Sequence, residues 1–251
     1  MLFDRPETAE LAKVSQRLEA EGPEAALRWT WQEYGPDVSL ACSFGGASGM
    51  VLVDMVSKLG LDLEVFYLDT GLLFAQTHAL REQIEQGYGI RAVAYKPALT
   101  VDQQAQKYGS ALWERDPDQC CAMRKLEPNR EALAGKRAWI TGIRRDQTAN
   151  RGAAQVVEWD ERFGLIKVNP VVGWTEDQVW DYIQQHDVPY HPLLEQGYSS
   201  IGCLPCTRAV APGEDARAGR WSGFMKTECG LHLPARKPVL PQISQQGSTE
   251  V

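Results

Sequence analysis

Four short apolar runs, separated by stretches with the composition of helices, dominate the middle of the sequence. They are VSLACS (38–43), LEVFYLD (63–69), IRAVAY (90–95) and AWITGI (138–143). Apolar strands that alternate with helices are typical of a mostly parallel sheet covered on both faces. The sequence therefore predicts an α/β fold, in which a mostly parallel, twisted sheet is flanked by helices.

Further helices are expected on either side of this alternation. The first thirty or so residues predict two, one beginning near Thr8 and one after the Gly22-Pro23 break. Another is predicted over 175–186, where Thr175 is placed to cap the first turn.

The loops that follow the predicted strands are the expected place for a ligand. Open α/β sheets bind ligands beyond the carboxyl ends of their strands, at the point where the strand order reverses. The informative loops are therefore 43–49, 69–72 and 142–151.

The pattern changes from Tyr198 onward, where Gly, Pro, Cys and Arg replace apolar periodicity. We therefore expect one α/β domain over residues 1–206 and a C-terminal segment, 207–251, laid over it rather than forming a second domain. The final PQISQQGSTEV is polar enough to be disordered.

Composition excludes some function classes. No apolar run approaches the ~18–20 residues that span a bilayer, so an integral membrane protein is not expected. The start MLFDRPETAELAKV lacks the basic-then-apolar layout of a secretory signal, which favours a cytoplasmic location. A net charge of −7 and a pI near 5.2 disfavour broad binding to nucleic acid or to anionic membranes.

Basic residues are nevertheless concentrated in two segments. Residues 124–151 hold eight basic and three acidic residues, and 203–237 hold six basic and three acidic ones. Two basic segments on an acidic protein indicate a compact anionic ligand, although two solvated helix faces would give the same composition.

Four of the six cysteines form a coherent set: the adjacent pair Cys120-Cys121 and the pair Cys203-x-x-Cys206. In a chain without an export signal, such thiols favour a metal site over disulfides. Four sulfur ligands suit zinc or an iron–sulfur cluster, and adjacent cysteines fit the larger face of a [4Fe–4S] cluster better than one small ion. Buried thiols without a metal are the alternative, and Cys42, within a predicted strand, is expected to be a core thiol.

Cys229 stands apart, in the sequence KTECGLH with Lys226 and His232 nearby. A thiol with basic neighbours, in a segment without apolar periodicity, fits a nucleophile better than a structural cysteine. A spare metal ligand or an inert surface thiol are the alternatives.

The segment SFGGASG (43–49) follows a strand and opens a helix. Glycines in such a turn allow backbone N–H groups to converge on an oxyanion at the helix N-terminus. The segment lacks the Gly-Lys-Ser/Thr ending of a Walker A loop, and a tight turn without a ligand would have the same composition.

Together these motifs resemble the family of assimilatory adenylyl-sulfate and phosphoadenylyl-sulfate reductases, over about residues 38–234. The matching motifs are SFGG, LDTG (68–71), CCAMRK (120–125), TGIRRDQTANR (141–151), CLPC (203–206) and RAGRW…KTECGLH (217–232). The two cysteine pairs mark the iron–sulfur branch. The resemblance implies the fold of the adenine nucleotide alpha hydrolase-like (PP-loop) superfamily. ATP-cleaving members carry SGGxDS, whose acidic residue is absent here, which disfavours ATP cleavage.

The resemblance also implies roles for individual residues. Cys229 and Lys125 would be catalytic, and Cys120, Cys121, Cys203 and Cys206 would hold one [4Fe–4S] cluster. The substrate would be bound by Ser43, Gly45, Gly46, Asp69, Thr70, Gly71, Arg144, Arg145, Arg217, Arg220 and His232.

The implied reaction is a two-step thiol exchange. The Cys229 thiolate would attack the sulfonyl sulfur of adenosine 5′-phosphosulfate, and thioredoxin, or a glutaredoxin-like dithiol donor, would then release sulfite. Because Cys229 must meet both the substrate and this partner, we expect the stretch 211–234 to move.

Several alternatives have testable differences. The same chemistry on the 3′-phosphorylated substrate is the nearest. A PP-loop tRNA sulfurtransferase would need SGGxDS and a basic RNA-binding face, and an ATP sulfurylase small subunit would need neither CCAMRK nor ECGLH. A metal-dependent redox sensor would not turn over with thioredoxin.

Overall fold

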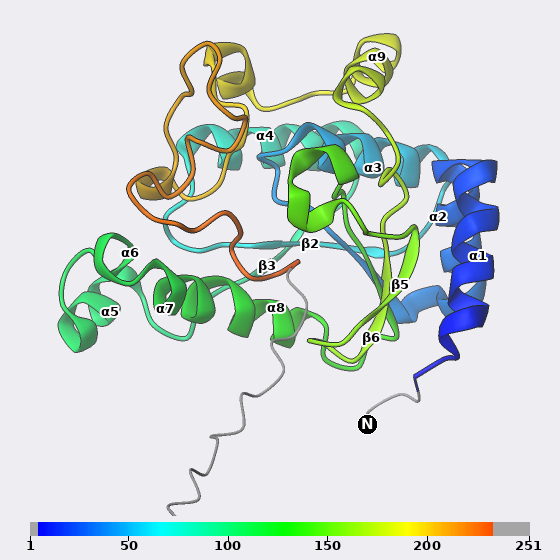
Figure 1. Ribbon diagram of the computed structural model, residues 1–251, viewed down its shortest axis with the longest axis horizontal. Coiled ribbons are helices and arrows are strands. Elements are labelled where there is room, and N and C mark those ends of the chain that lie inside the picture. Colours follow the sequence, from blue (N-terminus) through cyan, green and yellow to red (C-terminus); the bar gives the residue numbers. More distant parts are fainter. Residues whose placement is uncertain (1–4, 233–251) are drawn as a thin grey trace, which may run out of the picture.

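The four predicted strands lie side by side in one sheet. A computed structural model of the chain describes residues 5–232 and forms β1 (Val38–Ala41), β2 (Glu64–Leu68), β3 (Val93–Tyr95) and β4 (Ala138–Ile140). These strands pair in parallel in the order β3-β2-β1-β4 (Figure 1). The predicted α/β class and parallel sheet are confirmed.

Two further strands, which the sequence analysis did not identify, extend the sheet beyond β4. β6 (Leu165–Val168) pairs in parallel with β4, and β5 (Val157–Asp160) is antiparallel to β6. The hairpin was hard to recognise because charged residues interrupt its apolar pattern. Lys167 is buried in β6, and its Nζ lies 2.9 Å from Glu158 Oε1 on β5.

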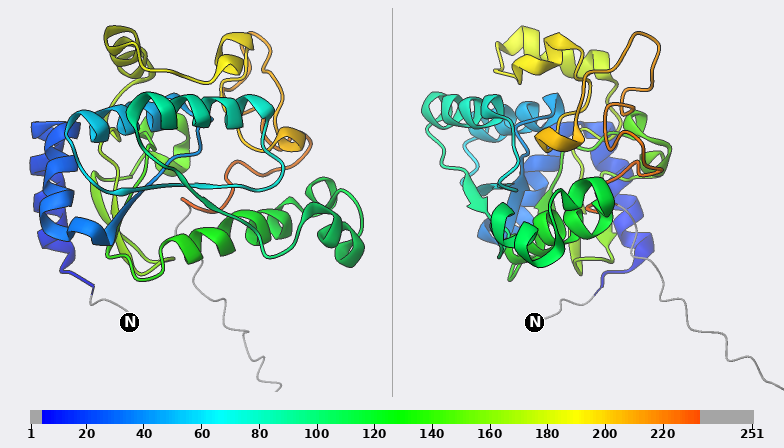
Figure 2. Two further views of the ribbon diagram at one scale, coloured as in Figure 1. Left: turned by 180° about the vertical axis from the view of Figure 1, so that it is seen from behind. Right: turned by 90° about the vertical axis from the view of Figure 1, so that its left-hand side faces the viewer.

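Helices cover both faces of the sheet (Figures 1 and 2). One face carries α3 (Ala47–Lys58) and α4 (Ala75–Tyr88), with α9 (Glu176–His186) farther out. The other carries α5 (Val101–Tyr108), α6 (Leu112–Arg115), α7 (Pro117–Cys121) and α8 (Glu127–Ala132).

The predicted helices outside the alternation are also present. The N-terminal helices α1 (Thr8–Glu21) and α2 (Pro23–Tyr34) lie at the side of the sheet where β5 is found. Thr175 caps α9 in a capping box with Gln178, as its sequence predicts. Within the described range, no helix is both long and apolar enough to cross a membrane.

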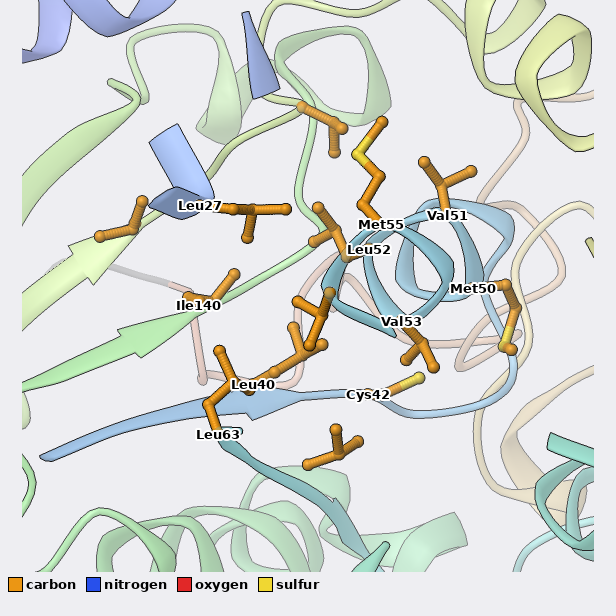
Figure 3. Close-up of a cluster of buried hydrophobic side chains, with 14 of the residues drawn as sticks. Leu27, Leu40, Cys42, Met50, Val51, Leu52, Val53, Met55, Leu63 and Ile140 are labelled. Atoms are coloured by element: carbon orange, nitrogen blue, oxygen red, sulfur yellow. The ribbon is translucent and has the colours of Figure 1, made fainter. Parts of the chain in front are cut away.

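The core consists of apolar side chains on the two faces of the sheet. On the α3 face, Leu40, Ile140 and most of α3 form the larger cluster, shown in Figure 3. On the α8 face, Phe66 and Trp139 form a smaller one. Burial of this apolar area stabilises the sheet and fixes the positions of the loops at its carboxyl edge.

The described part of the C-terminal segment, 207–232, has almost no regular structure and lies over the domain (Figure 1). An antiparallel bridge joins Thr207 to Arg220, and the Trp221 N–H donates to Cys206 O at 3.2 Å. The predicted disordered sequence PQISQQGSTEV lies outside the described residues, as does the end of the stretch 211–234. The division at residue 206 and the movement of the segment remain predictions.

Candidate active site

A cavity of about 350 Å³ opens at the carboxyl ends of β1, β2 and β4. Because β2 and β4 flank β1 on opposite sides, the strand order reverses at this point, where the sequence predicted a ligand. The loops after β1 and β4 meet there. A Cβ on Gly142 would lie 3.1 Å from the Gly49 nitrogen, so a side chain at this position would push the two loops apart.

The glycine-rich turn forms one wall of the cavity. Ser43, Gly45 and Gly46 line it, and Gly46 immediately precedes α3. The Gly45 N–H donates to Ser43 Oγ at 3.3 Å, and a Cβ on Gly45 would meet the Ile201 carbonyl oxygen at 3.0 Å. The turn is therefore compact, and the N-terminal end of α3 faces the cavity, which suits an anionic ligand.

Of the predicted Asp69-Thr70-Gly71 set, only Thr70 lines the cavity. The Asp69 carboxylate accepts from the Gly71 N–H at 3.1 Å and lies 3.6 Å from Lys96 Nζ, so it closes a turn after β2. Gly71 occupies the left-handed region, with φ of 69°, which explains the glycine. Asp69 and Gly71 therefore shape the loop and do not reach the cavity.

The structure separates the adjacent arginines 144 and 145. Arg144 lines the cavity, where it donates to Ser48 Oγ at 2.7 Å and to both Asp146 carboxylate oxygens. Arg145 instead donates to Glu19 and to the Ala154 carbonyl. Arg144 has extended backbone angles, and neighbouring side chains alternate in direction along such a backbone. Arg145 is therefore outside the cavity that the sequence analysis assigned to it.

Three further cations from the predicted set line the cavity, namely Lys125, Arg217 and Arg220. Both arginines donate to Ser200 Oγ at 3.3 Å. The Arg220 guanidinium lies over the Trp221 ring, and its Nε has no partner among the described residues. Lys125 lies on a π-helical turn, Ala122–Leu126, between α7 and α8. Burial lowers the pKa of Lys125, but the negative charge of the nearby Cys203 and Cys229 sulfurs, when they are ionised, outweighs this and raises it.

Cys229 also lines the cavity and is half-buried. The residue before it, Glu228, is buried and accepts from the Arg151 Nε and Nη2 groups, both at 2.8 Å. Burial alone would raise the pKa of Glu228, but the hydrogen bonds and charge of Arg151, with the charge of Arg217, hold it below its ordinary value. The segment thus places a thiol, a buried carboxylate and two arginines together.

His232 lies at the end of the described segment and lines the cavity as well. Its ring stacks on Trp139, with centroids 5.7 Å apart and planes 10° from parallel. Burial lowers the pKa of His232 well below 6.5, and its Nδ1 atom has no partner among the described residues. The imidazole is therefore neutral at neutral pH.

The four cysteines of the two predicted pairs line one small void beside the cavity, and Lys125 borders both spaces. Burial raises the pKa of Cys121 to about 11 and that of Cys206 to about 12. The Cys203 thiol lies 3.3 Å from Thr70 Oγ1. The void also borders Arg124, which is buried with its Nε and Nη2 atoms unpartnered within residues 5–232. Cys42 lies elsewhere, buried in the core as expected.

The sequence analysis missed some of the cavity's lining. Arg151 was counted in the basic segment but given no role, and Ser200, Trp139 and Glu228 were not singled out. The sequence offered a signal for two of these residues, because Arg151 lies in the basic segment 124–151 and Glu228 directly precedes Cys229. The other contacts depend on residues distant in sequence, which the fold alone brings together.

Comparisons with known proteins give a consistent result. The Phosphoadenosine phosphosulfate reductase domain matches residues 37–209, which include the sheet and both cysteine pairs. An Adenosine 5′-phosphosulfate reductase of Oceanobacillus iheyensis is 48% identical over 215 residues, covering 85% of this chain and 89% of the relative. One of Shouchella clausii is 44% identical over 236 residues, covering 94% and 98%.

Solved structures agree. Phosphoadenylyl-sulfate (PAPS) reductase from Candida auris, in a phosphate complex, matches with a TM-score of 0.73 and 31% identity, covering 82% of this chain and 99% of that one. A Candida glabrata FMN adenylyltransferase in complex with ATP has a TM-score of 0.54 at 15% identity, covering 80% of this chain and 65% of the other. The latter likeness shows a shared fold alone.

Proposed function

Because this chain belongs to the phosphoadenosine phosphosulfate reductase family, we propose that it reduces adenosine 5′-phosphosulfate to sulfite and AMP during sulfate assimilation. One observation carries the proposal. A single cavity at the carboxyl edge of the sheet is lined by a glycine-rich turn, by cationic side chains and by the thiol of Cys229. These are the groups that a nucleotide, a phosphosulfate and a sulfonyl transfer require.

The names of the relatives support the unmodified substrate. Curated relatives between 43% and 48% identical are adenosine 5′-phosphosulfate reductases, whereas the structural relative named for the 3′-phosphorylated substrate is 31% identical. The 3′-phosphorylated form is therefore the second candidate.

We propose that the phosphosulfate is held between the N-terminal end of α3 and the cations Lys125, Arg144, Arg217 and Arg220. Guanidinium groups match tetrahedral oxyanions, and charge-assisted hydrogen bonds are about twice as strong as neutral ones. Arg220 is the most available of the three arginines, since its Nε has no acceptor among residues 5–232. Lys125 borders both the cavity and the cysteine-lined void, where its charge can stabilise the phosphate oxygen that leaves.

In the first step, the Cys229 thiolate attacks the sulfonyl sulfur. A bond forms between the two sulfur atoms, the bond from sulfur to the bridging phosphate oxygen breaks, and AMP leaves with that electron pair. The enzyme is left as an S-sulfocysteine. The half-buried position of Cys229 in the cavity supports this role.

In the second step, a dithiol protein, thioredoxin by our proposal, supplies the two electrons. One of its thiolates attacks Cys229 Sγ and expels sulfite, and its second thiol then resolves the mixed disulfide. In the described structure Cys229 faces the cavity, so the segment 207–232 must swing outward to present the adduct.

We further propose that Cys120, Cys121, Cys203 and Cys206 hold a [4Fe–4S] cluster. The four thiols line one void, where four sulfur atoms suit such a cluster. The unpartnered nitrogens of buried Arg124 suit an anionic group beside them. When bound, the cluster would supply a fixed local charge and hold the loops that carry Lys125 and Cys206.

Product analysis tests the proposed substrate. Purified enzyme supplied with thioredoxin and equal concentrations of both adenylyl sulfates should release AMP and sulfite, with adenosine 3′,5′-bisphosphate as a minor product. Predominant formation of the bisphosphate would assign the 3′-phosphorylated substrate instead. Absence of sulfite from both would contradict the reductase activity.

A further inference from the structure

The carboxylate next to the nucleophile is unusually well held. Glu228 is 3% exposed, and it accepts from Arg151 Nε and Nη2 at 2.8 Å and from Thr148 Oγ1 at 3.2 Å. Arg217 Nη2 lies 3.4 Å from the same carboxylate. Glu228 therefore ties the segment that carries Cys229 to the loop after β4.

Arg151 gives two of its three guanidinium nitrogens to one buried carboxylate. Its Nε and Nη2 groups donate to Glu228, and its Nη1 group donates to Gln147. Arg220, in contrast, has an Nε without an acceptor in the part of the chain that the structure describes. Arg151 is therefore held by the protein through a buried ion pair, whereas Arg220 keeps a guanidinium nitrogen for a ligand.

Apolar packing does little to hold this segment. Within 207–232, Trp221 is the one hydrophobic side chain that is buried in the described structure. The Glu228–Arg151 contact lies next to the nucleophile, and both of its side chains are less than 10% exposed. Removing one partner of a buried ion pair leaves the other charge buried without compensation, which strongly destabilises the folded arrangement. The Glu228–Arg151 pair can therefore decide whether the segment is docked.

We propose that Glu228 and Arg151 are a positioning pair that docks the segment and holds the Cys229 thiol in the cavity. Neither residue needs to contact the reacting atoms. The pair fixes the direction of attack, and its separation accompanies the outward movement of the segment. The kinetic part of this inference rests on the proposed function, whereas the docking itself does not.

The first experiment measures docking without substrate. Glu228→Gln removes the negative charge and leaves the buried Arg151 without a counter-charge. The rate at which iodoacetamide alkylates Cys229, followed by peptide mass spectrometry, should then rise at least about fivefold. Glu214→Gln is the matched control, because Glu214 lies on the same segment but pairs with Arg208 at the surface. That control should react at the wild-type rate.

The second experiment separates the two chemical steps. With saturating adenosine 5′-phosphosulfate and no thioredoxin, Glu228→Gln should form the Cys229 adduct about ten- to a hundredfold more slowly. Release of sulfite from adduct prepared in advance should keep its wild-type rate with thioredoxin. If the wild-type enzyme forms no adduct, the proposed function fails, and the alkylation experiment still tests the docking.

Coupling between the two residues gives the sharpest test. The double variant Arg151→Gln/Glu228→Gln leaves no unpaired buried charge, so its alkylation rate should lie closer to wild type than that of either single variant. Thr148→Val removes a weaker contact and should give a smaller change in the same direction. Additive effects in the double variant, or wild-type alkylation and adduct rates in Glu228→Gln, would overturn the proposal.

Discussion

The α/β body and the segment 207–232 are stabilised by different interactions. The body has a large apolar cluster on one face of its sheet and a smaller one on the other. In the segment, the buried side chains are mainly charged or aromatic, namely Arg220, Trp221 and Glu228. Apolar packing gives the body one rigid arrangement, whereas a few ion pairs and hydrogen bonds can be broken and remade during a catalytic cycle.

The proposed chemistry needs a rigid body that holds the substrate and a segment that can move with Cys229, and the two kinds of packing suit these needs. The glycine-rich turn and Arg144 project from the sheet edge and line the cavity. Cys229 lies on the segment and can face two partners in turn. A substitution in the core, such as Ile140→Ala, should cost about 2–5 kcal/mol and weaken the whole fold, whereas a change in the segment should affect its docking.

The largest expected effect is a loss of activity that comes from the segment alone and leaves the α/β body folded. Cys229→Ser should abolish sulfite production, because a serine hydroxyl is a far weaker nucleophile than a thiolate. Wild-type enzyme incubated with substrate alone should gain about 80 Da, the mass of SO₃, on the peptide that contains Cys229, by the chemistry of a covalent intermediate.

Substrate binding and thermal stability of the serine variant show whether the α/β body is intact. It should bind substrate and keep its melting temperature, since Cys229 is half-buried and outside the core clusters. Sulfite production at the wild-type rate, or an adduct on another cysteine, would show that the segment does not carry the nucleophile.

Substitutions in the cysteine-lined void test the junction between the two regions. Replacing Cys120, Cys121, Cys203 or Cys206 with serine should lose iron, acid-labile sulfide and most of the activity together. Cys42→Ser should keep the iron, because Cys42 is buried in the core away from the void. A colourless, iron-free wild-type enzyme with full activity would contradict the proposed cluster.

Removing a cation that lines the cavity should have a smaller effect, and a cation outside the cavity provides the control. Lys125→Ala and Arg220→Ala should each reduce kcat/KM about ten- to a hundredfold, the value of one charge-assisted contact of about 1.5–3 kcal/mol. Arg145→Ala should leave kcat/KM unchanged, because this side chain pairs with Glu19 outside the cavity. Equal losses in all three variants would mean that Arg145 reaches the substrate.

The same contrast explains how much the sequence predicts. The parallel strands, the helix capped by Thr175 and the site at the strand-order reversal follow from local patterns and general rules of topology. The β5–β6 hairpin was missed because the buried Lys167 interrupts the apolar pattern of β6, and its ion-pair partner Glu158 lies on the neighbouring strand. The direction of Arg145 and the pairing of Arg151 with Glu228 depend on partners far away in sequence, which no local pattern reveals.

The smallest expected effect concerns pH and the docking of the segment. The folded-state pKa of Glu228 lies below its ordinary value of 4.5, with Arg151, Thr148 and Arg217 facing the carboxylate. A depressed folded-state pKa contributes stability that is fully present above the unfolded value and is lost as the pH falls through the folded one. At neutral pH, wild-type enzyme should therefore melt a few degrees above Glu228→Gln, at about 2–4 °C for each kcal/mol. The gap should narrow as the pH falls below 4.5, because a protonated Glu228 resembles the glutamine. Calorimetry of both proteins between pH 7 and pH 3.5 measures this gap, and a gap that stays constant would mean that the charge of Glu228 does not stabilise the docked segment.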